Sequence, residues 1–91
     1  MSIKAISWAF QTPVRPASAK LTLIAIADNC NFCLESWPSI DALVEKTSLD
    51  RKTVIASLGL LESAGLIFDT GKRVGSTRQI KVYRIVGLDD G

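Results

Sequence analysis

Two groups of residues in this sequence have types and spacings that could do chemistry, and the first is a cysteine pair. Cys30 and Cys33 have the C-x-x-C spacing of zinc and redox sites. The chain has no histidine and no other cysteine, so it lacks the four ligands of a structural zinc site. A zinc ion shared across a dimer stays open as an alternative. We expect two reduced cysteines in a loop, with no metal and no cofactor.

The second group is basic and could contact a polyanion. Arg51 and Lys52 are adjacent, and no acidic residue lies between Asp69 and Asp89. That acid-free stretch contains Lys72, Arg73, Arg78, Lys81 and Arg84. The net charge of +2 predicts no partner by itself, but this uneven distribution would suit nucleic acid. The alternative is that these side chains form a solvated face of a small domain.

The sequence lacks the residue patterns of an enzyme. Without histidine, general acid–base catalysis would fall on nine acidic residues that are spread along the chain. Neither a G-x-x-x-x-G-K phosphate-binding motif nor a zinc-protease motif is present. The loop 71–75 (GKRVG) has two glycines, but a strand is predicted to follow it, whereas phosphate-binding loops precede a helix. We therefore expect a protein that is not an enzyme.

The segment from Trp37 to Ile67 must position Arg51 and Lys52, and its pattern predicts two short helices. In the first, Ser39 is a candidate N-cap. The apolar residues that follow it on one helix face are Ile40, Leu43 and Val44. Residues 46–49 (KTSL) interrupt this pattern with side chains that favour turns, and Asp50 is a second candidate N-cap.

The second helix is predicted to bury one stripe and to expose the opposite face. Val54, Leu58 and Leu61 fall within a narrow arc at about 100° per residue, and Gly65 follows as a C-terminal glycine. Two helices this short, joined by a tight turn, must cross. This is a helix-turn-helix, in which the second helix presents its outer face and its first turn to solvent.

A β-hairpin is predicted to follow. Residues 66–68 (LIF) and 79–85 (QIKVYRI) have strand character, with Ile80, Val82 and Arg84 on one side of the second strand. Residues 69–78 are expected to form the loop, because they include Gly71 and Gly75. With a further apolar helix over 17–29, the fold class is α+β, mainly α. It is a winged helix-turn-helix of three helices plus a β-hairpin wing.

The chain is expected to form one domain. Its 91 residues, 47% of them hydrophobic, can bury a single core. We expect an N-terminal arm over residues 1–16, the winged helix-turn-helix domain over 17–88 and a C-terminal tail over 89–91. The arm is either an ordered segment or a short extra helix, with Trp8 and Phe10 inserted into the core or into a partner.

Membrane insertion and secretion are not indicated. The longest near-continuous apolar run, residues 21–27, is far shorter than the roughly 20 residues of a membrane span. Residues 1–12 lack the apolar region of a secretory signal, since Lys4, Trp8 and Gln11 interrupt it. A soluble cytoplasmic protein without membrane contact is expected.

The outward face of the second helix has an unusual composition for a DNA-reading helix. Its residues are Lys52, Ala56, Gly59, Leu60 and Ser63, of which only Lys52 is charged. The small side chains would leave a shallow groove, against which a DNA backbone or a second protein helix could lie closely. Ile55 and Leu60 border this groove and could form an interface. Alternatively, these two side chains pack against the arm or the wing.

Five segments together resemble a known family. They are Ala5–Ala9, the apolar helix that ends at Ala27–Asp28, Trp37–Ile40, Leu49–Val54 and Ala64–Ile67. These residues look like the winged-helix domain of phage and prophage replication-initiation proteins, and the likeness covers nearly the whole chain. It implies binding of double-stranded DNA at an origin or operator. Because the longer partner region of replication proteins is missing here, it implies a stand-alone regulator or an adaptor.

Residue roles follow if DNA is bound. Arg51, Lys52 and Thr53 would reach base edges or phosphates from the first turn of the second helix, and Ser48 would either cap the helix or touch phosphate. Ala56 would lie against the DNA along the same face. The wing residues Lys72, Arg73 and Arg78 would hold phosphates or enter the minor groove.

Two functions from different classes remain open at this point. The first is a double-stranded DNA-binding protein of phage or mobile-element type, acting in replication initiation or transcription regulation. The second is a protein-interaction module, either a homodimer or an adaptor or inhibitor that binds a host factor. Its interface would consist of Ile55, Gly59, Leu60 and Ser63. Both functions can hold together, because two-fold operators are usually read by dimers.

Overall fold

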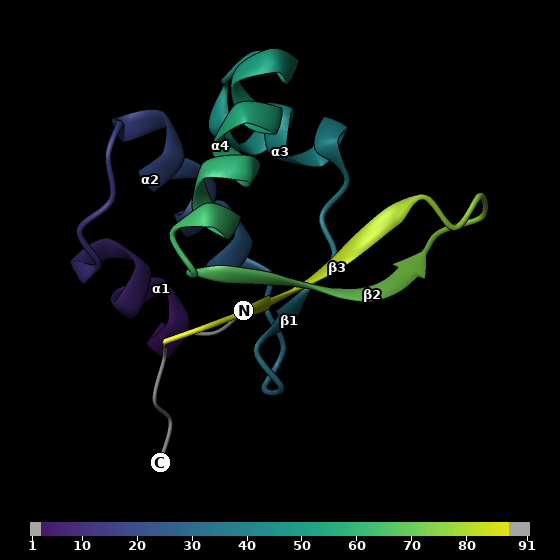
Figure 1. The fold of residues 1–91 in the computed structure, drawn as a ribbon, viewed down its shortest axis with the longest axis horizontal. Helices are drawn as coiled ribbons and strands as arrows, with labels where there is room; N and C mark the ends of the chain where they lie inside the picture. Colours follow the sequence, from purple (N-terminus) through teal and green to yellow (C-terminus); the bar gives the residue numbers. More distant parts are fainter. Residues whose placement is uncertain (1–2, 88–91) are drawn as a thin grey trace.

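The computed structural model describes residues 3–87 and contains four helices and three strands within that range. The helices are α1 (Ile3–Gln11), α2 (Ala17–Asp28), α3 (Ile40–Thr47) and α4 (Arg51–Ser63). The strands are β1 (Glu35–Ser36), β2 (Ile67–Val74) and β3 (Ile80–Ile85). The helices gather on one side, and the β2–β3 hairpin extends away from them (Figure 1). The expected tail, residues 89–91, lies outside the described range, as does residue 88.

The N-terminal segment contains a helix that shares the core. Ala5 and Ala9 of α1 are fully buried and belong to the main apolar cluster, in which Trp8 is partly buried. The Lys20 ammonium donates hydrogen bonds to the carbonyl oxygens of Phe10 and Thr12, both at 2.5 Å, which fixes the end of α1 to α2. The Phe10 side chain, by contrast, is 61% exposed and lies outside the core.

The helix-turn-helix forms where the sequence predicts it. The Ser39 hydroxyl accepts a hydrogen bond from the Ala42 backbone N–H at 3.0 Å, as expected of the N-cap of α3. α3 continues through Thr47, so the predicted turn at 46–49 is wrong by two residues. Ser48 makes the turn with a left-handed backbone at φ 62°, and Asp50 caps α4.

The end of α4 is set by Gly65. Its φ of +75° is a conformation that glycine adopts without strain. The backbone N–H of Gly65 donates to the carbonyl of Glu62, and that of Leu66 donates to the carbonyl of Leu61, each at 3.0 Å. This pair of bonds is a Schellman motif, which satisfies two carbonyls at the helix end and directs the chain into β2.

The hairpin differs from the expected one in length and in its neighbours. β2 runs on through Gly71 to Val74, so the predicted loop over 69–78 is wrong and the turn comprises residues 75–79. The pairing of β2 with β3 shifts between Asp69 and Arg73, and Gly71 there has φ +86°. This irregularity allows the strand to continue through residues that show no alternation.

A third strand completes the sheet, whose order is β1-β3-β2. β1 pairs with β3 in antiparallel register, with Glu35 opposite Arg84 and Ser36 opposite Tyr83. The sequence predicts no strand here, because two residues are too few to show a pattern. In β3, Val82, Tyr83 and Ile85 are all buried, so both faces are covered where the hairpin leaves the helices.

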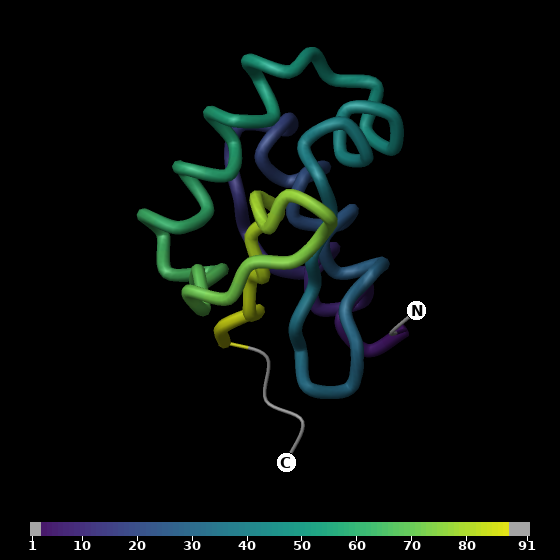
Figure 2. Tube along the Cα trace, turned by 90° about the vertical axis from the view of Figure 1, so that its right-hand side faces the viewer, coloured from purple at the N-terminus to yellow at the C-terminus, as the bar shows by residue number. Residues whose placement is uncertain are grey.

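The core lies where α2, α3 and α4 meet. The largest fully buried apolar side chains include Leu23 and Ile26 of α2, Leu43 of α3, and Val54 and Leu61 of α4. These are the inward-facing positions that helical spacing predicts for α3 and α4. In the view turned by 90°, the hairpin tip points toward the viewer and lies in front of the body (Figure 2). The fold is a winged helix-turn-helix with a fourth helix and a third strand.

Candidate nucleic-acid interface

α4 presents a face of small and apolar side chains to solvent. Because the opposite stripe of Val54, Ser57, Leu58 and Leu61 is buried, the exposed positions in the middle of the outward face are Lys52, Ala56, Gly59 and Ser63. Ile55 on one flank is 50% exposed, and Leu60 on the other is 38% exposed. A Cβ atom added to Gly59 would meet no atom within 4 Å, so the helix backbone is open to contact there.

The first turn of α4 is held by Asp50. Its carboxylate accepts the Thr53 backbone N–H at 3.0 Å and also the Thr53 hydroxyl. These hydrogen bonds hold the pKa of Asp50 below its usual value, because they favour the ionised carboxylate. The Thr53 side chain, expected to reach DNA, is therefore already engaged as a donor within the helix cap.

The two cations of the first turn differ in their surroundings. Arg51 Nη1 lies 3.0 Å from Asp41 Oδ1 in an exposed ion pair, which joins the start of α4 to the start of α3. Lys52 has no ion pair with any residue in the range 3–87. The sequence alone gave no reason to distinguish them, because Asp41 lies on the preceding helix.

The cations of the wing differ in the same way. Lys72 Nζ contacts both carboxylate oxygens of Glu35, at 2.8 and 3.0 Å. Arg73 contacts both oxygens of Asp69, at 3.0 and 3.2 Å. The Gly71 backbone N–H and then Arg73 hold the pKa of Asp69 below its usual value. Lys72 and Arg73 therefore both have acidic partners, although residues 70–88 contain no acid.

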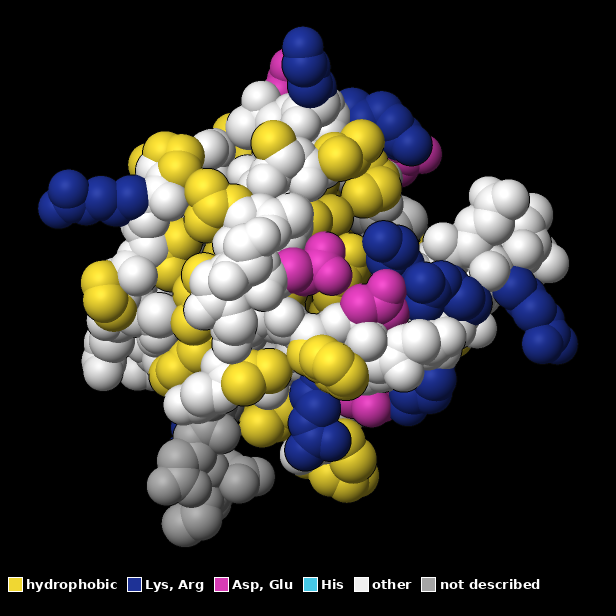
Figure 3. Space-filling view, viewed as in Figure 1, with side chains coloured by type: hydrophobic (Ala, Val, Ile, Leu, Met, Phe, Trp, Pro, Cys, Tyr) yellow, Lys and Arg dark blue, Asp and Glu magenta, His cyan; other side chains and the backbone are white. Residues whose placement is uncertain are grey.

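Other basic side chains of the hairpin stay unpaired within the described part of the chain. Arg78 is exposed in the turn at the hairpin tip, where its φ is 55°. Lys81 and Arg84 are exposed on β3. Lys and Arg side chains gather over the hairpin and near the start of α4, with acidic side chains among them (Figure 3). The surface is basic in places, but it is less uniformly so than the sequence suggests.

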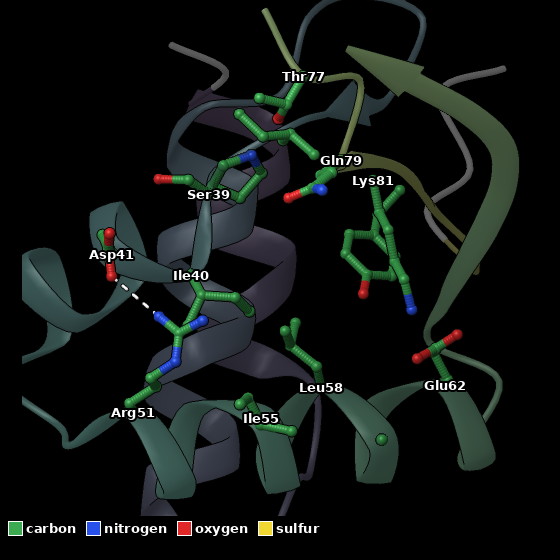
Figure 4. Close-up of a pocket in the computed structure, with 14 residues that line it drawn as sticks. Ser39, Ile40, Asp41, Arg51, Ile55, Leu58, Glu62, Thr77, Gln79 and Lys81 are labelled. Carbon is green, nitrogen blue, oxygen red and sulfur yellow. Dashed lines mark hydrogen bonds and ion pairs between the residues drawn. The ribbon is translucent and has the colours of Figure 1, made fainter. Parts of the chain in front are cut away.

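A groove of about 580 Å³ separates α4 from the hairpin. Ile55 and Leu58 project from α4 toward Ile40, with the Arg51–Asp41 pair at one end of the groove (Figure 4). Glu62 and Lys81 line the other end. The groove therefore combines an apolar middle with charges of both signs.

Tyr83 also lines this groove. Burial, followed by the negative charges of Glu62 and Asp69, raises the pKa of Tyr83 to about 12. Its phenol is thus neutral over the whole physiological pH range.

The predicted DNA-contacting residues fall into two places in the structure. The first place is the turn before α4 and the first half of that helix, which contain Ser48, Arg51, Lys52, Thr53 and Ala56. The second is the hairpin, which contains Lys72, Arg73 and Arg78. Sequence reasoning missed Glu35 and Asp41, the partners of Lys72 and Arg51. An acid in the first turn of α3 could have drawn attention to Asp41, whereas Glu35 lies 37 residues from Lys72 and has no local signal.

A family model described as a helix-turn-helix domain matches residues 16–67, which is more than half of the chain. This chain belongs to the helix-turn-helix domain family. The match spans α2, α3 and α4, and domains of this kind typically bind double-stranded DNA and are not enzymes. No curated protein and no solved structure matches the chain.

Among residues 3–87 of this helix-turn-helix domain, no group of three or more histidine, cysteine or acidic side chains is arranged to hold a metal ion. Cys30 is buried and Cys33 is exposed. No helix in the same range is long and apolar enough to cross a membrane.

Proposed function

We propose that this helix-turn-helix domain binds double-stranded DNA, with α4 in the major groove and the β2–β3 hairpin along the phosphate backbone. The observation that best supports this is that each part has an exposed cation without an ion pair in the described range 3–87, Lys52 at the start of α4 and Arg78 at the hairpin tip. A helix and a wing that approach one duplex would bring these two side chains to phosphates at separate positions.

In this proposal α4 contacts DNA through Arg51 and Lys52 in its first turn, and Ser48 contacts DNA from the turn before α4. Lys52 needs no rearrangement to reach a phosphate or a base edge. Arg51 can do so by leaving Asp41, because an exposed ion pair is worth only about 0–1 kcal/mol. Ser48 is exposed in the turn before α4 and can donate its hydroxyl to a phosphate. Ala56 would lie against the DNA one turn further along.

The hairpin would supply contacts without sequence discrimination. Arg78 at its tip is exposed and makes no ion pair with any residue in the range 3–87. Lys72 and Arg73 are exposed enough to contact phosphate while they keep their carboxylate partners nearby. We expect these two to contribute less to affinity than Arg78, because each would exchange one anion for another.

The biological setting we propose is a phage or mobile-element protein acting in the cytoplasm, in replication initiation or in transcription regulation. The resemblance of five segments to the winged-helix domain of replication-initiation proteins supports this setting. The family match to a helix-turn-helix domain is compatible with it but is less specific.

A second candidate function is contact with another protein, a further copy of the chain or a host factor, through the outward face of α4. The exposed fractions of Ile55 and Leu60 favour it, because solvent-exposed aliphatic side chains beside Gly59 and Ser63 form a flat, partly apolar surface. A homodimer built there would cover the helix that the DNA proposal needs. Light scattering of the free protein distinguishes these cases, since a dimer through α4 should dissociate in the Leu60→Glu variant.

The test of the DNA proposal is selection of binding sites from a pool of random duplexes. We expect repeated rounds to enrich a short defined sequence, and we expect chemical footprinting to show protection of one major groove and of the adjacent backbone. A folded protein that enriches no sequence and retains no duplex at low salt would contradict the proposal.

A further inference from the structure

The exposed surface of α4 offers no side-chain donor to a DNA base along the stretch that separates Lys52 from Ser63. Between Lys52 and Ser63, its exposed residues are Ile55, Ala56, Gly59, Leu60 and Glu62, four without a polar side-chain atom and one acceptor. Thr53 lies nearby, but its hydroxyl already donates to Asp50. A helix with this surface cannot read guanine or adenine in the usual way, by donating to the acceptor atoms on their major-groove edges.

One group in the major groove does match such a surface. Thymine presents a C5-methyl group there, and it is the only apolar group that distinguishes the four bases. Ile55 is half exposed on the flank of α4, and Ala56 has an exposed methyl group about 100° further round the helix, in the middle of the outward face. Gly59 leaves the backbone open one turn further on, so the floor of the major groove can approach closely.

We propose that α4 recognises thymine by apolar contact of Ile55 and Ala56 with the C5-methyl group. This inference rests on the proposed binding of DNA and adds the chemical class of base that α4 reads. The selected sites should therefore contain thymine at the positions that face the middle of α4. Guanine should be favoured only near the first turn, where Arg51 and Lys52 lie.

Charge complementarity argues for DNA as the occupant of this apolar face. Ile55 lines the groove between α4 and the hairpin, and Lys81 lines the same groove. Lys52 lies one turn before Ala56 on the outward face of the helix. Lys52 and Lys81 make no ion pair within residues 3–87, and they border the apolar residues on two sides, although Glu62 lies at the same end of the groove as Lys81. The two cations can contact the phosphates on either side of the base edges.

The experiment compares thymine with deoxyuridine, which lacks only the methyl group. Selected duplexes are prepared with each thymine position replaced in turn, and their affinities are measured by fluorescence anisotropy at one salt concentration. We expect about fourfold weaker binding for each contacted methyl group that is removed. In the Ile55→Ala variant this ratio should fall toward one.

A matched control is Leu21→Ala. Leu21 is a 39% exposed aliphatic residue of α2, outside the helix-turn-helix face, and its loss should leave the thymine-to-deoxyuridine ratio unchanged. Equal affinity of the unsubstituted protein for both duplexes overturns this inference and leaves DNA binding intact. A ratio that survives in Ile55→Ala overturns the assignment to Ile55. Failure to bind either duplex overturns the proposed function itself. The comparison in the unsubstituted protein needs no variant to fold.

Discussion

Arg51 donates a hydrogen bond to Asp41 across the helix-turn-helix, with 3.0 Å between the guanidinium and carboxylate atoms. The contact joins the first turns of α4 and α3, and both side chains are largely exposed. The Asp41 carboxylate that holds Arg51 is negatively charged, so DNA phosphates repel it. The pair is weak enough to open, so Asp41 is expected to tune how readily Arg51 reaches a duplex.

Replacing Asp41 by asparagine should strengthen DNA binding. The substitution frees Arg51 and removes one negative charge beside α4. We expect a gain of about three- to fivefold, which corresponds to roughly 0.7–1 kcal/mol for an exposed charge interaction. Glu45→Gln on the same helix removes an equal charge that has no ion pair in the described structure, and it should change affinity less. Equal effects of the two variants in an anisotropy titration would show that the Arg51 contact is irrelevant.

Two glycines at α4 should respond to alanine in opposite directions. Gly59 is inside the helix with open space at its Cβ position, so Gly59→Ala should raise the free energy of unfolding by about 0.5–1 kcal/mol. Gly65 has φ +75°, so Gly65→Ala should lower it by about 1–2 kcal/mol. Urea denaturation measures both. Changes of the same sign would contradict this account of the helix end.

The Gly59→Ala variant also separates stability from function. Its added methyl group projects from the outward face of α4, where base edges are proposed to approach. We therefore expect a more stable protein that binds DNA more weakly. A variant that is more stable and binds equally well would place the duplex elsewhere on the molecule.

Tyr83 should ionise only at strongly alkaline pH. It is the only tyrosine of the chain, so the absorbance of tyrosinate reports it alone. We expect a midpoint at about 12 in the folded protein, because burial and the charges of Glu62 and Asp69 disfavour the anion. In denaturant the midpoint should return to about 10. Glu62→Gln should lower the folded value, and a folded midpoint near 10 would refute the buried placement.

The difference between the folded and unfolded pKa of Tyr83 makes the free energy of unfolding depend on pH in the alkaline range. The folded state favours neutral Tyr83, so its contribution to stability is fully present below about pH 10, the unfolded pKa. That contribution is lost as the pH rises from 10 through the folded pKa of about 12. In Tyr83→Phe, this part of the alkaline loss of stability should be absent.

The helices could be predicted from the sequence because their determinants are local. Ser39 and Asp50 cap their helices through residues three positions ahead, and Gly65 ends α4 with its own backbone. The buried stripe of Val54, Leu58 and Leu61 follows from helical spacing alone. In each case a short window of sequence contains both partners of the interaction.

The hairpin and its charges could not be predicted in the same way. β2 continues through Gly71 because β3 pairs with it, although most residues beyond Phe68 are polar and show no alternation. Lys72 contacts Glu35, which lies 37 residues earlier in the sequence, and the pairing of β1 with the sheet brings the two side chains together. The count of charges between Asp69 and Asp89 therefore overstated the free positive charge of the wing, since Lys72 pairs with Glu35 of β1 and Arg73 pairs with Asp69 at the edge of the counted stretch.

The central claim is that α4 and the hairpin bind one duplex, and the salt dependence of DNA binding tests it most directly. Affinity for a selected duplex is measured between about 50 and 200 mM salt for the unsubstituted protein, Lys52→Ala and Arg78→Ala, with Lys4→Ala on α1 as the control. We expect each of the first two substitutions to weaken binding and to reduce the slope of log affinity against log salt by about 0.9. Lys4→Ala should leave both unchanged. A slope that Lys52→Ala and Arg78→Ala leave unaltered, or no binding at 50 mM, would contradict the claim.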